Sequence, residues 1–226
     1  MTKDISPIYD DIAEKIITMK LVPGEKISEI ESSQRYNVSR TPIRDVFKRL
    51  EDNGLLEIRS QSGTFVTKIN LSNINDLVYM RNCCEYSVLS ELAGKLTKEN
   101  TNALMSNLQK QMRLSENQMP MEQFADSYFE LDNSFHQYLY SLAGREGVLK
   151  LLNSDQPGFQ RYRFITFLRE ESELKRLNEV HTKMVKALVD NDLRALGDIV
   201  YEHNYSGLRG IDKVIAAHPD YFVQKE

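Results

Sequence analysis

Apolar and polar residues recur at helical spacing over most of the chain, and the clearest case lies in its first quarter. Four apolar residues there are three or four positions apart, which is the spacing of a buried helix face. They are Ile43, Val46, Phe47 and Leu50. Arg40, Arg44 and Lys48 fall on roughly the opposite face. Thr41 is expected to be the N-cap and Pro42 the first helical residue. The pattern predicts a helix that packs by one face and starts with arginines, where the helix dipole would favour acids.

The residues before this helix predict a shorter one over 28–36, with Ile30 facing inward. Asn37 then stands where helices commonly end on a left-handed residue. Two helices joined by a tight turn, the second beginning with basic residues, are typical of a helix-turn-helix. Arginine can donate two hydrogen bonds to a guanine in the major groove. The flanking residues therefore favour a DNA-reading helix over a surface helix whose charges are merely solvated.

The same region contains the signals of a wing and of one further helix. Gly54 ends the basic helix, and residues 55–59 and 64–67 alternate as strands do, with a glycine-containing turn between them. Residues 5–22 carry isoleucines at helical spacing and are followed by a Pro-Gly stop. These elements predict a winged helix-turn-helix over residues 1–70.

From residue 71 to residue 226 the apolar periodicity is that of helices, without a strand signal. Such a run of amphipathic helices with short breaks predicts an antiparallel helical bundle. The predicted fold is therefore mainly α, with a winged helix-turn-helix followed by an all-α antiparallel bundle. A length of 226 residues suits two modest domains of this kind.

The net charge of −4 is unevenly distributed along the chain. Residues 1–70 hold 11 basic and 11 acidic residues, whereas residues 35–49 hold five basic residues and one acid. A local basic patch is sufficient to bind phosphates. No apolar run approaches the roughly 20 residues of a membrane span, and no signal peptide opens the chain, so we expect a cytoplasmic protein without membrane contact. The adjacent Cys83 and Cys84 are expected to be reduced.

A second group of chemically distinctive residues lies in the helical part. Asp132 and His136 are one helical turn apart, and His181 and His203 each continue an apolar stripe. A single histidine on an apolar face is more often a core residue than a metal ligand. Three inward histidines together with a carboxylate make a divalent metal site the better interpretation, with zinc, nickel, manganese or iron as candidates.

The N-terminal motifs resemble those of a known family. Ser39-Arg40-Thr41-Pro42-Ile43-Arg44-Asp45, Asn53-Gly54-Leu55 and Gly63-Thr64-Phe65-Val66 are similar to the DNA-binding domain of GntR-family transcription regulators. The resemblance implies that Arg40 and Arg44 contact bases or phosphates and that Gly63 approaches the minor groove. Ile30 stands where some members have a DNA-contacting arginine. The DNA contacts we expect are Arg35, Ser39, Arg40, Thr41, Arg44, Lys48 and Gly63.

The helical part resembles the FCD domain of the FadR-type branch of that family. The similarity rests on Arg81-Asn82-Cys83-Cys84-Glu85, Asp132-Asn133-Ser134-Phe135-His136, Glu179-Val180-His181 and His203. It implies a divalent ion, with zinc as the first candidate, held by Asp132, His136, His181 and His203. It also implies that Arg81 lines a pocket for a small carboxylic-acid effector.

These observations predict a DNA-binding transcriptional regulator and not an enzyme, and the resemblance implies that it is a repressor. The resemblance implies a homodimer that binds a pseudo-palindromic DNA operator, with binding controlled by the effector. Three alternatives stay open. The ion could be purely structural, the bundle could be a metal-dependent hydrolytic enzyme, or the winged domain could be an adaptor that binds protein.

Overall fold

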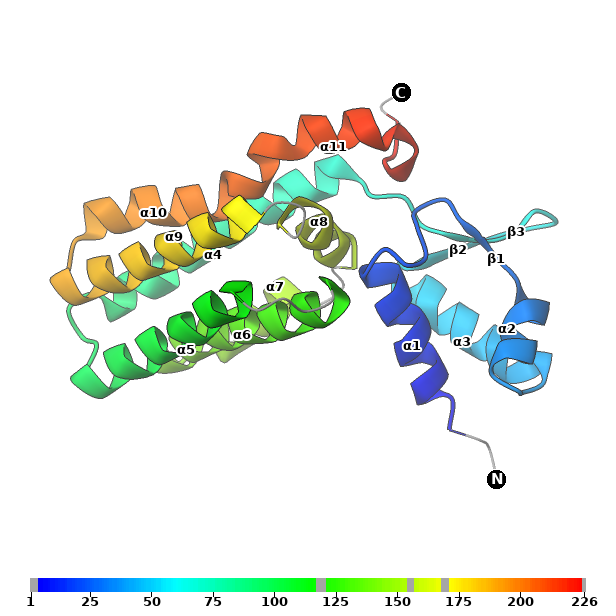
Figure 1. Ribbon diagram of the computed structural model, residues 1–226, viewed down its shortest axis with the longest axis horizontal. Coiled ribbons are helices and arrows are strands. Elements are labelled where there is room, and N and C mark those ends of the chain that lie inside the picture. Colours follow the sequence, from blue (N-terminus) through cyan, green and yellow to red (C-terminus); the bar gives the residue numbers. More distant parts are fainter. Residues whose placement is uncertain (1–3, 117–120, 154–156, 168–170, 225–226) are drawn as a thin grey trace. The chain divides into compact units, whose positions relative to one another are not determined.

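The computed structural model describes residues 4–116, 121–153, 157–167 and 171–224. Most of the chain is helical, and a small antiparallel sheet lies near the N-terminus (Figure 1). The chain packs as two compact units. The first contains Met1–Ile74, Asp155–Ile165 and Asp212–Glu226, and the second contains Asn75–Ser154 and Thr166–Ile211. Two segments from beyond residue 70, which the sequence places with the helical part, therefore pack with the N-terminal residues.

The N-terminal elements of the first unit form a winged helix-turn-helix, as the sequence predicts. In chain order they are α1 (Ser6–Ile17), β1 (Lys26–Ile27), α2 (Glu29–Arg35), α3 (Arg40–Asp52), β2 (Leu56–Arg59) and β3 (Gly63–Val66). The antiparallel sheet has the order β1-β3-β2, with Lys26 opposite Phe65 and Arg59 opposite Gly63. The β2–β3 hairpin is the wing.

Helix α3 packs by the face that its apolar residues predict. Ile43, Val46, Phe47 and Leu50 are all buried. They pack with apolar residues of α1 and of the wing strands, among them Ile16, Leu56 and Val66. Burial of apolar surface stabilises a fold by about 25 cal/mol per Å², and this burial holds α3 against the rest of the unit. Its basic face is consequently left toward solvent.

Both helices of the helix-turn-helix end as the sequence predicts. Asn37 has a φ of 50° and Gly54 a φ of 68°, so both adopt the left-handed conformation expected after a helix. At the end of α3 the Leu55 N–H donates to the Leu50 carbonyl and the Gly54 N–H donates to the Glu51 carbonyl, each at 2.8 Å. These two bonds satisfy carbonyls that the helix itself leaves unpaired.

Three local predictions were wrong. Helix α1 ends at Ile17 and not near residue 22, because Met19 turns the chain with a φ of 62°. Helix α3 begins at Arg40 with Ser39 as N-cap, so Pro42 is its third residue. Proline is tolerated there because the first N–H groups of a helix lack partners anyway. Ile30 is 53% exposed and not inward-facing, since α2 is short and buries none of its residues completely.

The remaining parts of the first unit form hydrogen bonds with residues that follow the wing, among them Thr67 and Ile69. They come from α8 (Pro157–Phe167), α11 (Ile211–Ala217) and the short helix η2 (Pro219–Tyr221). The buried Arg161 donates to the Thr67 carbonyl at 2.5 Å and to Thr67 Oγ1 at 3.0 Å. Ile69 exchanges backbone hydrogen bonds with the C-terminal residues around Phe222. The C-terminal tail, which has no clear periodicity in sequence, is thus ordered by the residues that follow the wing.

The second unit is a helical bundle, as predicted. Its helices are α4 (Leu71–Leu92), α5 (Lys98–Glu116), α6 (Met121–Leu142), α7 (Glu146–Asn153), α9 (Glu171–Asp190) and α10 (Leu193–Tyr205), followed by η1 (Ser206–Gly210). The long helices run alongside one another (Figure 1). Leu89, Leu108, Leu139 and Leu188 belong to their shared core. No helix in the described ranges is long and apolar enough to cross a lipid bilayer.

Candidate nucleic-acid interface and metal centre

The first turn of α3 and the tip of the wing border a hollow of about 440 Å³, here called the arginine groove. Its lining residues are Lys26, Ile27, Ser28, Glu29, Ile30, Glu31, Arg40, Arg44, Gly63 and Thr64. The side chains of Arg40 and Arg44 are 53% and 61% exposed. The structure therefore brings three of the predicted DNA-contacting residues, Arg40, Arg44 and Gly63, to one solvent-facing site.

Glu29, the first residue of α2, holds both groove arginines. Its Oε2 accepts a hydrogen bond from Arg40 Nη2 at 2.8 Å and another from Arg44 Nε at 2.9 Å. The hydrogen bond from Arg40, aided by that from Arg44, lowers the pKa of the Glu29 carboxyl against the opposing effect of its partial burial. Sequence reasoning missed Glu29. The only signal in the sequence was an acid directly after Ser28, the N-cap of α2. An acid there is common in helices, so it did not indicate a contact with the arginines of α3.

The wing tip requires glycine at position 63. Gly63 has a φ of 119°, and a Cβ built there would lie 2.5 Å from Cε of Lys26. Lys26 and Arg59 both approach the Phe65 ring, at 5.8 and 4.6 Å from its centroid. Cationic side chains from β1 and from the wing thus lie around a glycine that permits close approach of the backbone.

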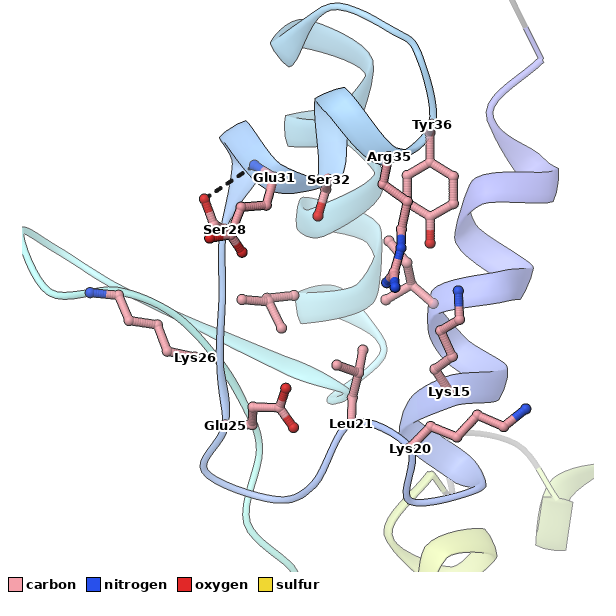
Figure 2. Close-up of a pocket in the computed structure, with 12 residues that line it drawn as sticks. Lys15, Lys20, Leu21, Glu25, Lys26, Ser28, Glu31, Ser32, Arg35 and Tyr36 are labelled. Carbon is pink, nitrogen blue, oxygen red and sulfur yellow. Dashed lines mark hydrogen bonds between the residues drawn. The ribbon is translucent and has the colours of Figure 1, made fainter. Parts of the chain in front are cut away.

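Other predicted DNA contacts lie outside the arginine groove. Arg35 lines a separate hollow of about 590 Å³, where it lies near Lys15 and Tyr36 (Figure 2). Lys48 Nζ is 2.9 Å from Glu51 Oε2 and 3.2 Å from Asp52 Oδ1. The role of both side chains as DNA contacts stays a prediction.

Ser39 and Thr41 remain at the start of α3. Both are exposed, and the hydroxyl of Ser39 does not cap a helix N–H. An exposed hydroxyl at a helix N-terminus is a suitable donor to a phosphate. Their positions are therefore compatible with the predicted role, which stays untested.

The three predicted histidine ligands meet inside the second unit and are here called the histidine centre. His136 lies on α6, His181 on α9 and His203 on α10. One ring nitrogen of each lies within 4.8 Å of the others. Their ring centroids are 4.7 to 5.2 Å apart. Residues distant in sequence are thus brought to the spacing at which they can share one ion.

His181 is completely buried, and neither of its ring nitrogens has a hydrogen-bond partner among the described residues. Burial, together with the nearby His203, lowers the pKa of His181 well below its usual value, although Asp132 opposes the shift. The imidazole is therefore neutral at neutral pH, which is the form that binds a metal. A buried polar group left without a partner is costly, and a metal ion could bind the unprotonated nitrogen of this ring.

Asp132 lies one turn before His136 on α6 and is also buried. Its Oδ1 is 3.8 Å from Nε2 of His181, which is too long for a hydrogen bond. Two ligands of one ion, each bonded at about 2.1 Å, can be this far apart. The group of donor atoms that all lie within 4.8 Å of one another contains the three histidines and does not include Asp132. Three imidazoles with a buried carboxylate beside His181 suit a divalent transition metal, so the residues fit such an ion.

Glu85 of α4 completes the surroundings of the histidine centre and was not predicted as a site residue. His136 Nδ1 is 2.9 Å from Glu85 Oε1, and Asn204 donates to Oε2 at 2.6 Å. Burial alone would raise the pKa of Glu85, but His203, His136 and these hydrogen bonds hold it well below the usual value. A carboxylate behind a ligating histidine fixes the ring and its tautomer. The available signal was an acid within the apolar stripe of α4.

Arg81 and Asn178 are the remaining polar groups of interest in the second unit. Arg81 Nη2 donates to the Leu152 carbonyl at 3.0 Å and to Asn153 Oδ1 at 2.5 Å. Asn178 lies one turn before His181 on α9 and is only 3% exposed. Its side-chain oxygen and nitrogen have no hydrogen-bond partner among the described residues. Sequence reasoning missed Asn178, since a single asparagine in a helix gives no distinctive signal.

Comparison with known families assigns most of the chain. Residues 5–66 match the family of bacterial regulatory proteins, gntR family, and residues 76–205 match the FCD domain. The chain is 28% identical to the HTH-type transcriptional repressor RspR of Escherichia coli K12, over 96% of this chain and 93% of that protein. It is 29% identical to the Nta operon transcriptional regulator of Aminobacter aminovorans, over 74% and 75% of the two chains.

Solved structures show the same fold at lower sequence identity. E. coli McbR/YncC has a TM-score of 0.66 at 16% identity, with 95% of this chain and 99% of that chain covered. Lar, which controls expression of the Listeria monocytogenes agr system, has a TM-score of 0.62 at 17% identity, with the same coverage. At these identities the likeness concerns the fold alone.

Proposed function

This chain belongs to the GntR family of DNA-binding transcriptional regulators and carries an FCD domain, and from this premise we propose how it reads DNA and what controls it. The arginine groove reads the operator, and the histidine centre holds a divalent ion at which a small organic acid controls DNA binding. The observation that carries the proposal is that two chemically specialised sites, one exposed and cationic and one buried and metal-competent, occur in the two matched regions.

DNA reading is assigned to Arg40 and Arg44, with Gly63 of the wing beside them. The support is their exposure together on one hollow at the start of α3. Arginine side chains at the start of such a helix can reach base edges in the major groove, and a bidentate pair with guanine is worth about 1–3 kcal/mol of discrimination. Ser39, Thr41, Lys48 and Arg35 are assigned to the phosphates on either side.

The divalent ion would be held by His136, His181 and His203, with Asp132 as the fourth ligand. Zinc is the first candidate because imidazole and carboxylate ligands suit it, and nickel, manganese and iron share this preference. When bound, the ion supplies a Lewis-acid position to which a carboxylate can attach. Glu85 holds the ring of His136 in the tautomer that presents Nε2 as the acceptor nitrogen.

The effector is a small carboxylic acid, and Arg81 and Asn178 are its proposed protein contacts. Asn178 lies on the same face of α9 as His181, and its buried amide offers both a donor and an acceptor. Arg81 is one turn from Glu85 on α4 and already donates to the end of α7. An acid that attracts Arg81 would therefore compete with its bonds to Leu152 and Asn153, which gives the ligand a means to displace α7.

Repression is the proposed sign of regulation, since a relative similar over nearly the whole chain is named a transcriptional repressor. In this reading the protein binds its operator without the acid and releases it when the acid binds. Regulation of this kind requires that the acid and DNA favour different conformations of the same protein.

A homodimer is proposed, with an exposed aromatic face of α4 and α10 as its interface. Tyr79, Met80, Tyr86 and Tyr201 are large and exposed. A Cβ built on Gly197 of α10 would lie 3.4 Å from Cε2 of Tyr86 on α4, so the two helices are adjacent there. An exposed apolar patch of this kind marks interaction surfaces. Light scattering with Tyr79→Arg/Tyr201→Arg should give a monomer, whereas the wild type should give a dimer; a dimer in both would move the interface elsewhere.

A purely structural ion is the second candidate, because the three histidines come from three helices and an ion would tie them together. The two roles differ in one experiment. The protein is stripped with a chelator, reloaded with zinc, and screened against small carboxylic acids by thermal shift, followed by duplex binding. The proposal expects an acid that stabilises the zinc form only and weakens DNA binding. Stabilisation by zinc with no acid response in either form would favour the structural role.

A further inference from the structure

The two groove arginines are not equivalent, because a single carboxylate oxygen holds them by different nitrogens. Glu29 Oε2 accepts from Nη2 of Arg40 but from Nε of Arg44. A guanidinium that grips a guanine end-on uses its two terminal nitrogens, Nη1 and Nη2. Which nitrogen Glu29 occupies therefore decides what each arginine can still offer to DNA.

Arg44 keeps both terminal nitrogens available. Its bond to Glu29 is made through Nε, and among the described residues it makes no other hydrogen bond. The side chain is 61% exposed. Because the guanidinium is planar and fixed at Nε, its direction is set before DNA arrives, and less conformational entropy is lost on binding. Arg44 is thus prepared to contact a base.

Arg40 has one terminal nitrogen already engaged by Glu29. To grip a guanine end-on it would have to break that bond, whereas a single contact to a phosphate leaves it intact. The carboxylate also offsets one of the two positive charges in the groove. Non-specific binding depends on the number of cations that neutralise phosphates, so this offset weakens association with arbitrary DNA more than with the correct site.

From these contacts we infer that Glu29 is a positioning residue that determines base specificity: it presents Arg44 to a guanine and confines Arg40 to a phosphate. This inference rests on the proposed function, since it requires that the arginine groove reads DNA. Glu29 does not itself touch the base in this scheme. It acts through the two guanidinium groups, and its removal leaves them mobile and mutually repulsive.

A structural role for Glu29 has to be separated from this one. An acid in the first turn of a helix stabilises the helix through its dipole, and α2 has two such acids, Glu29 and Glu31. Glu31 also lines the arginine groove, but among the described residues both groove arginines pair with Glu29. Glu31→Ala is therefore a matched control that removes the same charge from the same turn. Melting temperatures of both variants show whether α2 tolerates the loss.

The experiment uses the full-length protein and a random-sequence duplex library. Sequencing of the bound fraction gives the base preference at each position for the wild type, Glu29→Ala, Glu31→Ala, Arg44→Ala and Glu29→Ala/Arg44→Ala. The duplex most enriched by the wild type and a scrambled duplex of the same composition then serve as probes for dissociation constants at several salt concentrations. Glu29→Gln, which keeps one acceptor oxygen without charge, is measured on the same probes.

For Glu29→Ala we expect the ratio of the two dissociation constants, scrambled over enriched, to fall at least about fivefold, the lower end for one lost bidentate contact. The lost preference should lie at the base pair that Arg44→Ala also loses. Glu29→Gln should fall between the wild type and Glu29→Ala. Glu31→Ala, which leaves the bonds of Glu29 to both arginines in place, should keep the base preference of the wild type. The double variant should lose no more than Arg44→Ala alone.

Three results would overturn different parts of the account. An unchanged ratio and preference in Glu29→Ala, while Arg44→Ala loses its base preference, would contradict the role of Glu29 and leave the proposed function intact. An unchanged preference in Arg44→Ala would contradict the arginine groove itself. A similar loss in Glu31→Ala would mean that α2 as a whole, and not the Glu29 contact, is responsible.

Discussion

The arginine groove and the histidine centre both gather ionisable side chains from separate elements, but they differ in solvent exposure. Arg40 and Arg44 are more than half exposed, whereas His181 is completely buried. An exposed charge is solvated and screened, and keeping it there costs the fold little. A buried polar group without a partner costs much more. The groove therefore needs no ligand for stability, whereas the proposed ion would relieve a cost at the histidine centre.

This difference predicts how each site responds to substitution. Changes in the groove should alter DNA binding and leave stability unchanged. Changes at the histidine centre should alter metal content and stability together, because the proposed ion would satisfy groups that the fold has buried. The four predictions below test this contrast in order of decreasing expected effect.

The largest effect is expected for His181→Ala. The variant removes one proposed ligand, so bound metal should fall from about one per chain to nearly none, measured by elemental analysis after gel filtration. Its melting temperature should match that of chelator-treated wild type. His218→Ala is the control, because His218 is the fourth histidine and lies in the other unit, stacked on Tyr221. Full metal retention in His181→Ala would remove this residue from the ligand set.

Arg44→Ala should weaken binding to the duplex enriched by the wild type by about 1–3 kcal/mol, the usual worth of a bidentate base contact. Its melting temperature should stay at the wild-type value, because the side chain is 61% exposed and pairs only at the surface with Glu29. Fluorescence anisotropy and differential scanning fluorimetry measure the two quantities. A loss of stability as large as the loss of affinity would mean that the groove is not independent of the fold.

Glu85→Gln should lower metal affinity by about tenfold, the lower end of the range for removing a partner of a ligating histidine. The amide keeps the size of the side chain, but its oxygen accepts a weaker hydrogen bond from His136 than the carboxylate does. Competition with a chromogenic chelator measures the affinity. Glu91→Gln, an exposed acid also on α4 that pairs with Arg145, should leave it unchanged. Equal effects in the two variants would argue against a specific role for Glu85.

The smallest effect is expected for Lys48→Ala. Its ammonium already pairs with Glu51 and Asp52, whose hydrogen bonds raise the pKa of Lys48. A phosphate contact would have to compete with these acids, so duplex affinity should change by no more than about twofold, as for an ordinary surface substitution. Anisotropy titrations at several salt concentrations measure it. A change as large as that of Arg44→Ala would place Lys48 among the principal DNA contacts.

The two sites also differ in how far the sequence predicted them. The winged helix-turn-helix depends on local signals. The two helix ends at Asn37 and Gly54 and the buried face of α3 could each be predicted from a few neighbouring residues. The histidine centre depends on helices distant in sequence. Its histidines could be proposed because the inward face of each helix was evident and the family resemblance supplied the ligand set.

The residues that sequence reasoning missed are those whose role depends on tertiary contacts. Glu29 is 11 and 15 residues from the arginines it holds, and Glu85 is 119 residues from Asn204. No periodicity connects such residues. Two helix boundaries were misplaced for a different reason. The end of α1 was missed because Met19 adopts a left-handed conformation although it is not glycine. The start of α3 was missed because proline is tolerated throughout a first helical turn and so does not mark its first residue.

The central claim is that the exposed arginines serve DNA alone while the buried histidines serve the ion. Its most direct test is the Arg40→Ala/Arg44→Ala variant, assayed in parallel for binding to the wild-type-enriched duplex and for metal content. The account predicts that specific duplex binding is lost and that metal content and melting temperature match the wild type. Duplex binding at wild-type affinity would contradict it.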